Sequence, residues 1–251
     1  MRYAANLSIL FPDLALLDRP AAAARAGFTA VESWWPWPSA TPSATEVDGF
    51  VAAIEAAGVE LIALNVFAGD MPAGDRGIVS WAGREPEFAA AVRTCVDIGK
   101  RLGTRMFNAL YGNRDLDPGV AISNLRHAAT VAAEIGATIL LEPVSAAPGY
   151  PLRTAADVVA VLDAVDADNV ALLADLYHLS VNADDVPTVI DVHFSRIAHV
   201  QIADSPGRHE PGTGTLDLST WLRTLEGRGY AGYVAAEYVP TGAGFDWREW
   251  L

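Results

Sequence analysis

One pattern recurs along the whole of this 251-residue sequence and limits what it can fold into. An alanine-rich segment of helical periodicity leads, in most copies through a glycine, into a short apolar run rich in β-branched residues. That run then ends on or close to a polar side chain. The spacing of the copies, roughly 30 to 40 residues, is typical of a βα unit. The sequence therefore predicts alternating helices and strands throughout.

Eight strands are predicted, over residues 3–10, 28–33, 59–65, 104–110, 137–143, 170–175, 196–204 and 230–237. Helices are predicted between them, over residues 21–26, 45–57, 88–102, 120–135, 155–165, 185–194 and 218–228. The glycines between helix and strand suit helix ends, because the residue after the last turn often has a positive φ. Only residues 241–251 follow the last strand, so the final helix is expected to be short or incomplete.

Alternating helices and strands predict an α/β fold with a parallel sheet, and eight units predict closure into a (β/α)8 TIM barrel. We expect a single domain over residues 1–251, without a linker. An open, doubly wound sheet is the alternative. Against it, no GxGxxG motif follows the first strand, and polar residues end nearly every strand instead of gathering at one switch point. In a barrel, all of these strand ends lie on the face where active sites form.

Composition disfavours several classes of protein. The net charge of -14 disfavours a nucleic-acid partner, which needs clustered basic residues. The single cysteine, Cys95, excludes a disulfide framework and a cysteine-based zinc site. The N-terminal segment is a poor signal peptide, and no apolar run approaches the roughly 20 residues of a membrane span. We therefore expect a cytoplasmic protein with no membrane partner, either a monomer or a homo-oligomer.

Four strand ends carry oxygen-donor side chains: Glu142, Asp175, Gln201 and Glu237. Three carboxylates that converge in a barrel mouth repel one another unless a cation neutralises them. Oxygen ligands favour Mg²⁺ or Mn²⁺ over zinc, which prefers Cys and His. Each residue alone could be a solitary polar cap on its strand, but the four together favour a divalent metal site.

Five stretches resemble motifs of hydroxypyruvate isomerase and its 2-oxo-tetronate isomerase relatives, which belong to the xylose isomerase-like barrels. They are ALNVFAGDMPAGDRG, LLEPVS with PGYPL, DLYH, HVQIADSPGRHEPGTG and AAEYVP. The resemblance covers residues 32–240 and is strongest over 200–214. It implies that the four oxygen-donor residues are metal ligands, and that Glu142 and Glu237 also act as catalytic proton donor and acceptor.

The implied reaction is an aldose-ketose isomerisation that interconverts hydroxypyruvate and tartronate semialdehyde, or a similar short sugar acid, through a cis-enediolate. Such a substrate carries a carboxylate, so a cation should face the pocket. Arg208 is predicted to bind that carboxylate, because a guanidinium can bind two oxygens at once. Similar barrel epimerases place an arginine in this loop and a histidine three residues after the aspartate ligand, which is His178 here.

Other polar residues have weaker claims to the site. His178 is predicted to bind a substrate oxygen, or else only to fix its loop. His209, Asn65 and Asn108 are candidates for substrate binding, although loop bonding or helix capping explains each nearly as well. Strand alternation places His199 one layer below Gln201, where we expect it to orient that ligand.

The loop over residues 69–77 could cover the site, and Arg76 within it could bind a carboxylate or pair with Asp75. Glu32 ends a strand on the same face. Like Asn65 and Asn108, it could line the pocket, or it could serve loop bonding or helix capping. The cluster of Trp34, Trp35 and Trp37 is expected to serve apolar packing or a subunit contact rather than to form a pocket wall.

Three positions depart from the family pattern: Thr215 replaces a glutamate, Ser145 an asparagine and Ser180 a glutamine. Peripheral polar contacts of this kind select the substrate. A ketose 3-epimerase, which uses the same paired glutamates on one carbon, therefore stays an alternative. So does a non-catalytic metabolite-binding barrel, although the presence of both glutamates weighs against it. An apurinic endonuclease needs a histidine-rich site, which five histidines and a net charge of -14 fit badly.

Overall fold

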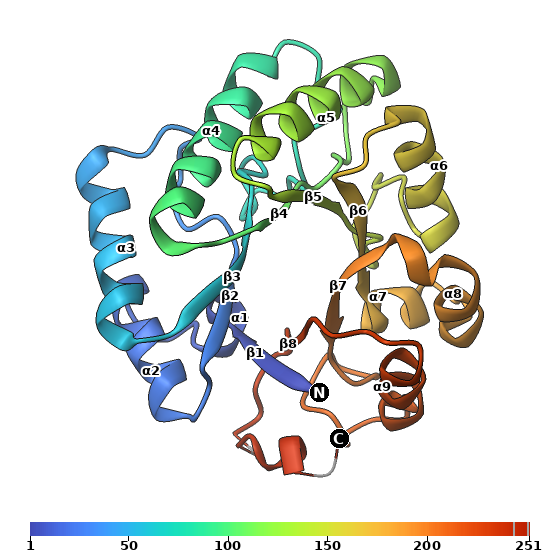
Figure 1. Cartoon of the computed structure of the whole chain (residues 1–251). Helices are drawn as coiled ribbons and strands as arrows, with labels where there is room; N and C mark the ends of the chain where they lie inside the picture. Colours follow the sequence, from blue (N-terminus) through green and yellow to red (C-terminus); the bar gives the residue numbers. More distant parts are fainter. Residues whose placement is uncertain (243, 250) are drawn as a thin grey trace.

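The computed structural model describes residues 1–242, 244–249 and 251, and within them the sheet closes into a barrel of eight parallel strands. The strands neighbour one another in chain order, and β8 pairs with β1 to complete the ring. Figure 1 shows the helices as an outer layer around the strands. The predicted TIM barrel is confirmed. The strands are β1 Arg2–Asn6, β2 Ala30–Ser33, β3 Glu60–Asn65, β4 Met106–Asn108, β5 Thr138–Leu141, β6 Val170–Asp175, β7 Ile197–Ile202 and β8 Tyr233–Ala236.

The long helices begin and end at residues with clear capping roles. Ser43 and Glu46 form a capping box at the start of α3, and Gly58 and Gly103 end α3 and α4 at positive φ. The helices are α1 Leu7–Leu10, α2 Arg19–Arg25, α3 Ala44–Ala57, α4 Glu85–Leu102, α5 Pro118–Ala133, α6 Ala155–Val165, α7 Leu176–Val181, α8 Val186–His193 and α9 Leu218–Gly227. Short 3-10 turns cover Leu16–Asp18, Phe194–Arg196 and Asp246–Glu249.

The structure corrects the predicted elements at two strand ends. The first strand stops at Asn6, whose side chain accepts a hydrogen bond from the Ser8 N–H, so that Leu7–Leu10 form helix α1 instead of continuing the strand. Asp175 likewise caps α7, a helix that the sequence pattern did not predict. Both corrections have the same cause, since a polar residue at a strand end can also start a helix there.

The core has two parts. A small cluster inside the barrel consists of Ala4, Ala30, Ile62, Ala63 and Ala235, and a larger cluster fills the layer between strands and helices. Small side chains suit the narrow interior of an eight-stranded barrel. In the part of the chain that the structure describes, no helix combines the length and hydrophobicity needed to cross a bilayer.

Candidate functional site

The carboxyl ends of the strands open into a pocket of about 550 Å³. Its lining includes Glu142 after β5, Glu237 after β8, and His178 in α7. Asp175, the last residue of β6, lies beneath them and is fully buried. One ligand atom from each of these four side chains lies within 4.8 Å of the others. The structure therefore brings the three predicted carboxylates together.

Burial sets the protonation of this cluster. It raises the pKa of Glu142 well above its ordinary range, and the nearby charges of Glu237 and Asp175 raise it further. Burial also raises the pKa of Glu237 to about 8, although the Arg208 guanidinium opposes this shift. In His178 burial lowers the pKa to about 4, so the imidazole is neutral near pH 7. Both glutamates therefore hold a proton more readily than an exposed carboxyl group does, as acid-base chemistry requires.

Arg208 supplies positive charge between the carboxylates. Its Nη2 forms ion pairs with Glu237 and, at 3.3 Å, with Oδ2 of Asp175. The Arg208 Nε also donates to the backbone oxygen of Glu237 at 3.2 Å. The arginine thus lines the pocket as predicted, but acidic residues of the site already bind its guanidinium.

The tautomer of His178 follows from its neighbours. The backbone N–H of Ser145 donates to His178 Nδ1 at 3.1 Å, so this nitrogen is an acceptor and the neutral ring carries its proton on Nε2. Nε2 faces Oε1 of Glu142 at 3.7 Å and Oδ2 of Asp175 at 3.6 Å. In this tautomer His178 can donate a hydrogen bond into the pocket but cannot bind a metal through Nε2.

Glu32 links several buried groups of the site in a way that sequence reasoning missed. Its Oε1 accepts from Gln201 Nε2 at 2.6 Å and from Asn6 Nδ2 at 2.8 Å, and its Oε2 lies 2.6 Å from His199 Nε2. Asn6 Nδ2 also reaches Glu237 Oε1 at 3.0 Å. Each of these residues lies at a strand end or alternates with a strand-end residue along the same strand, so its position fits the sequence pattern. Their pairing was hidden because Glu32 and Gln201 are far apart in sequence.

Gln201 leaves one polar atom without a partner. Its Nε2 is fixed by Glu32, whereas its Oε1 is buried and has no hydrogen-bond partner among the described residues. A buried, unpaired carbonyl oxygen is costly unless a ligand completes it. This oxygen and the carboxylates of Glu142, Asp175 and Glu237 form a hard donor set, which fits Mg²⁺ or Mn²⁺.

The remaining candidate residues differ in whether they line the pocket. Asn65 lines the pocket. Asn108 is buried and donates to Glu142 Oε2 at 2.8 Å, so it supports a carboxylate rather than reaching into the pocket. His199 is fully buried, and its Nε2 lies beside Glu32 Oε2, so the residue that directly bonds the Gln201 amide is Glu32 and not His199 as predicted. His209 lies outside the pocket lining, where its Nδ1 donates to the backbone oxygen of Val239 at 2.9 Å.

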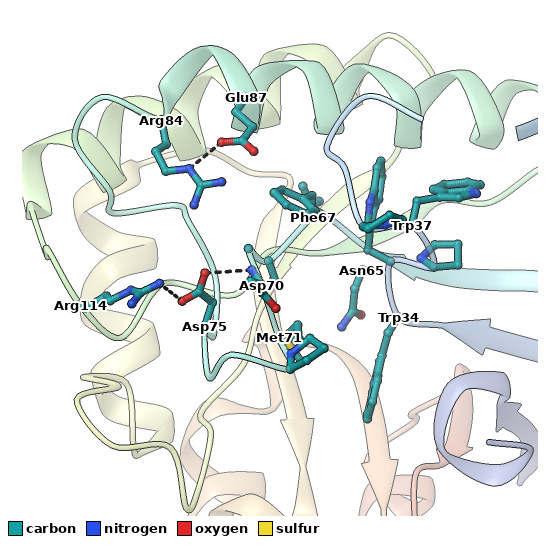
Figure 2. A pocket seen from close by; sticks show the side chains of 17 residues that line it. Trp34, Trp37, Asn65, Phe67, Asp70, Met71, Asp75, Arg84, Glu87 and Arg114 are labelled. Carbon is teal, nitrogen blue, oxygen red and sulfur yellow. Dashed lines mark hydrogen bonds and ion pairs between the residues drawn. The ribbon is translucent and has the colours of Figure 1, made fainter. Parts of the chain in front are cut away.

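A second hollow of about 750 Å³ adjoins the first, and Figure 2 shows its lining. Trp34, Asn65, Met71 and Pro72 line both hollows, so they form a shared wall. Trp34 also donates to Glu237 Oε1 at 2.7 Å. The expectation that this tryptophan serves packing or a subunit contact was therefore incomplete, because its indole contacts a carboxylate of the site. The predicted role in apolar packing agrees with the position of Trp37, which is buried against Phe50.

Comparison with known proteins gives consistent matches. A family model described as xylose isomerase-like TIM barrel matches residues 20–250. A Streptomyces coelicolor protein that carries a provisional hydroxypyruvate isomerase name is 49% identical, over 95% of this chain and 91% of the relative. A 2-oxo-tetronate isomerase of Cupriavidus necator is 34% identical, over 98% and 96%. The hydroxypyruvate isomerase of Escherichia coli is 30% identical, over 99% and 98%.

Among solved structures, one described as AP endonuclease, family 2 from Brucella melitensis matches with a TM-score of 0.90 and 33% identity. The match covers 99% of this chain and 98% of the Brucella chain. The similarity therefore extends over the whole barrel, including the strand ends that carry the carboxylates.

Proposed function

Because the chain belongs to the hydroxypyruvate isomerase family of xylose isomerase-like TIM barrels, we propose that it interconverts hydroxypyruvate and tartronate semialdehyde, or a closely similar pair of short sugar acids. The observation that carries the proposal is the pair Glu142 and Glu237. Both carboxyl groups are buried, both have a raised pKa, and both face one pocket. A site that only bound a metabolite would need no such acid-base pair.

The reaction moves a carbonyl group between neighbouring carbons. One glutamate takes a proton from C3 of hydroxypyruvate, a proton is returned to C2 of the resulting enediolate, and the proton of the C3 hydroxyl passes to the C2 oxygen. Glu142 and Glu237 come from β5 and β8, between which β6 and β7 lie in the ring, so they approach the substrate from different sides (Figure 1). The Nε2–H of His178 can donate to a substrate oxygen as charge develops on it.

Glu142, Asp175, Gln201 and Glu237 would hold the divalent cation. When bound, the cation polarises the carbonyl and stabilises negative charge on the substrate oxygens. Asp175 is held in place by its Oδ1, which accepts the N–H groups of Tyr177 and His178 at the start of α7. Asn6 and Trp34 hold Glu237, and Asn108 holds Glu142.

The endonuclease description of the Brucella structure does not transfer to this chain. Its net charge is -14, and only one histidine, His178, belongs to the described acidic cluster. A polyanionic DNA substrate would be repelled by such a surface.

The proposed isomerase activity is tested by incubating the protein with Mg²⁺ or Mn²⁺ and hydroxypyruvate and following products by NMR. Appearance of the aldehyde supports an isomerase, whereas inversion at C3 of D-fructose in a parallel incubation, without an aldehyde product, would support the epimerase alternative.

The pH dependence of metal binding follows from the raised pKa values. A cation requires deprotonated glutamates, and in the metal-free protein the pKa of Glu237 is about 8. Below pH 8, metal binding must therefore release protons, and affinity should strengthen as the pH rises from 6 to 8. Calorimetry in buffers of different ionisation enthalpy measures the release. An affinity independent of pH over this range would contradict the assignment of Glu237 as a ligand.

Replacement of Glu32 tests whether it fixes the Gln201 amide. We expect Glu32→Gln to weaken Mn²⁺ affinity by about 10-fold, because residues that orient metal ligands contribute on this scale. The neutral side chain can still accept from Gln201, but without charge assistance. Titration of the metal-free variant with Mn²⁺ checks this. An exposed substitution, Glu60→Gln, serves as the control, and an equal loss in both variants would remove the positioning role from Glu32.

A further inference from the structure

We propose that Arg76, in the loop between β3 and α4, binds the carboxylate of the substrate and so selects acids over neutral sugars. The inference rests on the proposed function and deepens it, because it names the group that recognises the substrate class. Arg76 lines the same pocket as Glu142 and Glu237. The sequence pattern predicted this role for Arg208. The two arginines differ, however, in which groups of the protein already bind them.

The charge of Arg208 is committed within the protein. It pairs with Glu237 and Asp175, two residues of the proposed metal site. In contrast, over residues 1–242, 244–249 and 251 no carboxylate lies within ion-pair distance of Arg76. Its sequence neighbour Asp75 does not neutralise it, because the Asp75 carboxylate pairs with Arg114 and accepts the Asp70 N–H (Figure 2). Arg76 therefore offers the pocket an uncompensated positive charge.

The Arg76 side chain is held by one corner of its guanidinium. Nη1 donates to the backbone oxygens of Asp75 at 2.7 Å and Met71 at 3.1 Å. Within the described part of the chain, Nε and Nη2 have no hydrogen-bond partner. These two nitrogens form the edge of a guanidinium that binds both oxygens of a carboxylate at once.

The loop that carries Arg76 is rigid at its base. The Arg76 N–H donates to Asn113 Oδ1 at 3.0 Å, and Asn113 Nδ2 donates in turn to Gly74 O and Pro148 O. Gly77 has a φ of +105°, and a Cβ there would lie 1.9 Å from Leu110 O, so the backbone approaches as only glycine allows. A carboxylate therefore meets a guanidinium that is already in place, which lowers the entropic cost of binding.

A matched pair of substrates separates charge recognition from a loop-holding role. Hydroxypyruvate and dihydroxyacetone share the same hydroxymethyl-ketone unit, but the second has a neutral CH₂OH group where the first has its carboxylate. For Arg76→Gln we expect kcat/KM for hydroxypyruvate to fall about 10- to 100-fold, mainly through KM, as for the loss of a charge-assisted hydrogen-bond pair. The value for dihydroxyacetone should change less than about twofold.

Arg84→Gln is the matched control, because Arg84 lines the neighbouring hollow and pairs with Glu87 at 2.5 Å. It removes the same charge and should leave both substrates unaffected. Equal losses on both substrates in Arg76→Gln would overturn the proposal, since they would show that Arg76 only holds its loop.

Binding of tartronate, measured by calorimetry, gives a test that does not depend on turnover. We expect Arg76→Gln to weaken it about 10- to 100-fold and Arg84→Gln to leave it unchanged. If the unmodified protein isomerised neither substrate, the proposed function would fail while this measurement still decided the role of Arg76. Equal tartronate affinity in the unmodified protein and Arg76→Gln would overturn that role.

Discussion

Glu237→Gln is expected to lower kcat about 10²- to 10⁴-fold while the protein stays folded. The glutamine oxygen can still accept from Trp34 Nε1 and Asn6 Nδ2, which now bind Glu237 Oε1 at 2.7 and 3.0 Å. It can also still bind a cation, with reduced affinity. An amide cannot accept and return a proton, however, so the loss should lie in kcat and not in KM.

Steady-state kinetics at saturating Mn²⁺ measures this effect, and thermal unfolding confirms that the variant is folded. Glu55→Gln, at an exposed position on α3, is the control for the same chemical change away from the pocket. Turnover within a few-fold of the unmodified protein in Glu237→Gln would exclude Glu237 from the proton transfer.

Asp175→Asn should weaken divalent metal affinity by about 100-fold or more. Residues that merely orient a ligand contribute about 10- to 100-fold, and this substitution removes the charge of a proposed ligand itself. Asparagine is as good an N-cap as aspartate, so the hydrogen bonds to Tyr177 and His178 at the start of α7 should persist. The fold should therefore survive while the cation site is lost.

Mn²⁺ titration of the metal-free variant, followed by activity at rising Mn²⁺, measures this loss. Asp217→Asn is the matched control, because Asp217 also caps a helix, α9, but lies on an exposed part of the chain. Unchanged affinity in Asp175→Asn would remove this residue from the proposed metal site.

The barrel was predictable because its signal is repeated and local. Each βα unit carries its own periodicity and polar strand end, so an error in one unit does not change the fold class. The first strand illustrates the limit: Tyr3 to Leu10 is a mostly apolar run that contains Asn6 and Ser8, and the cap at Asn6 turns its second half into helix α1. Competition between strand and cap depends on where the sheet ends, which the local pattern does not reveal.

The carboxylates of the site were predictable for the same reason, since parallel strand ends must meet on one face. The hydrogen bonds between side chains of the site were not predictable from the sequence pattern. Glu32 binds His199 and Gln201, and Trp34 binds Glu237, across separations of 167 to 203 residues. The position of Arg208 was anticipated, but its ion pairs with Glu237 and Asp175 depend on where the loop after β7 folds.

Solvent exchange tests proton transfer by paired glutamates most directly. The protein is incubated in D₂O with Mg²⁺ or Mn²⁺ and hydroxypyruvate, and the carbons are followed by NMR against a sample without protein. We predict that tartronate semialdehyde forms with deuterium at C2, because the proton returned to the enediolate comes from a carboxyl group that exchanges with solvent. Product that forms without deuterium would indicate direct hydride transfer between the carbons and would contradict the roles of Glu142 and Glu237.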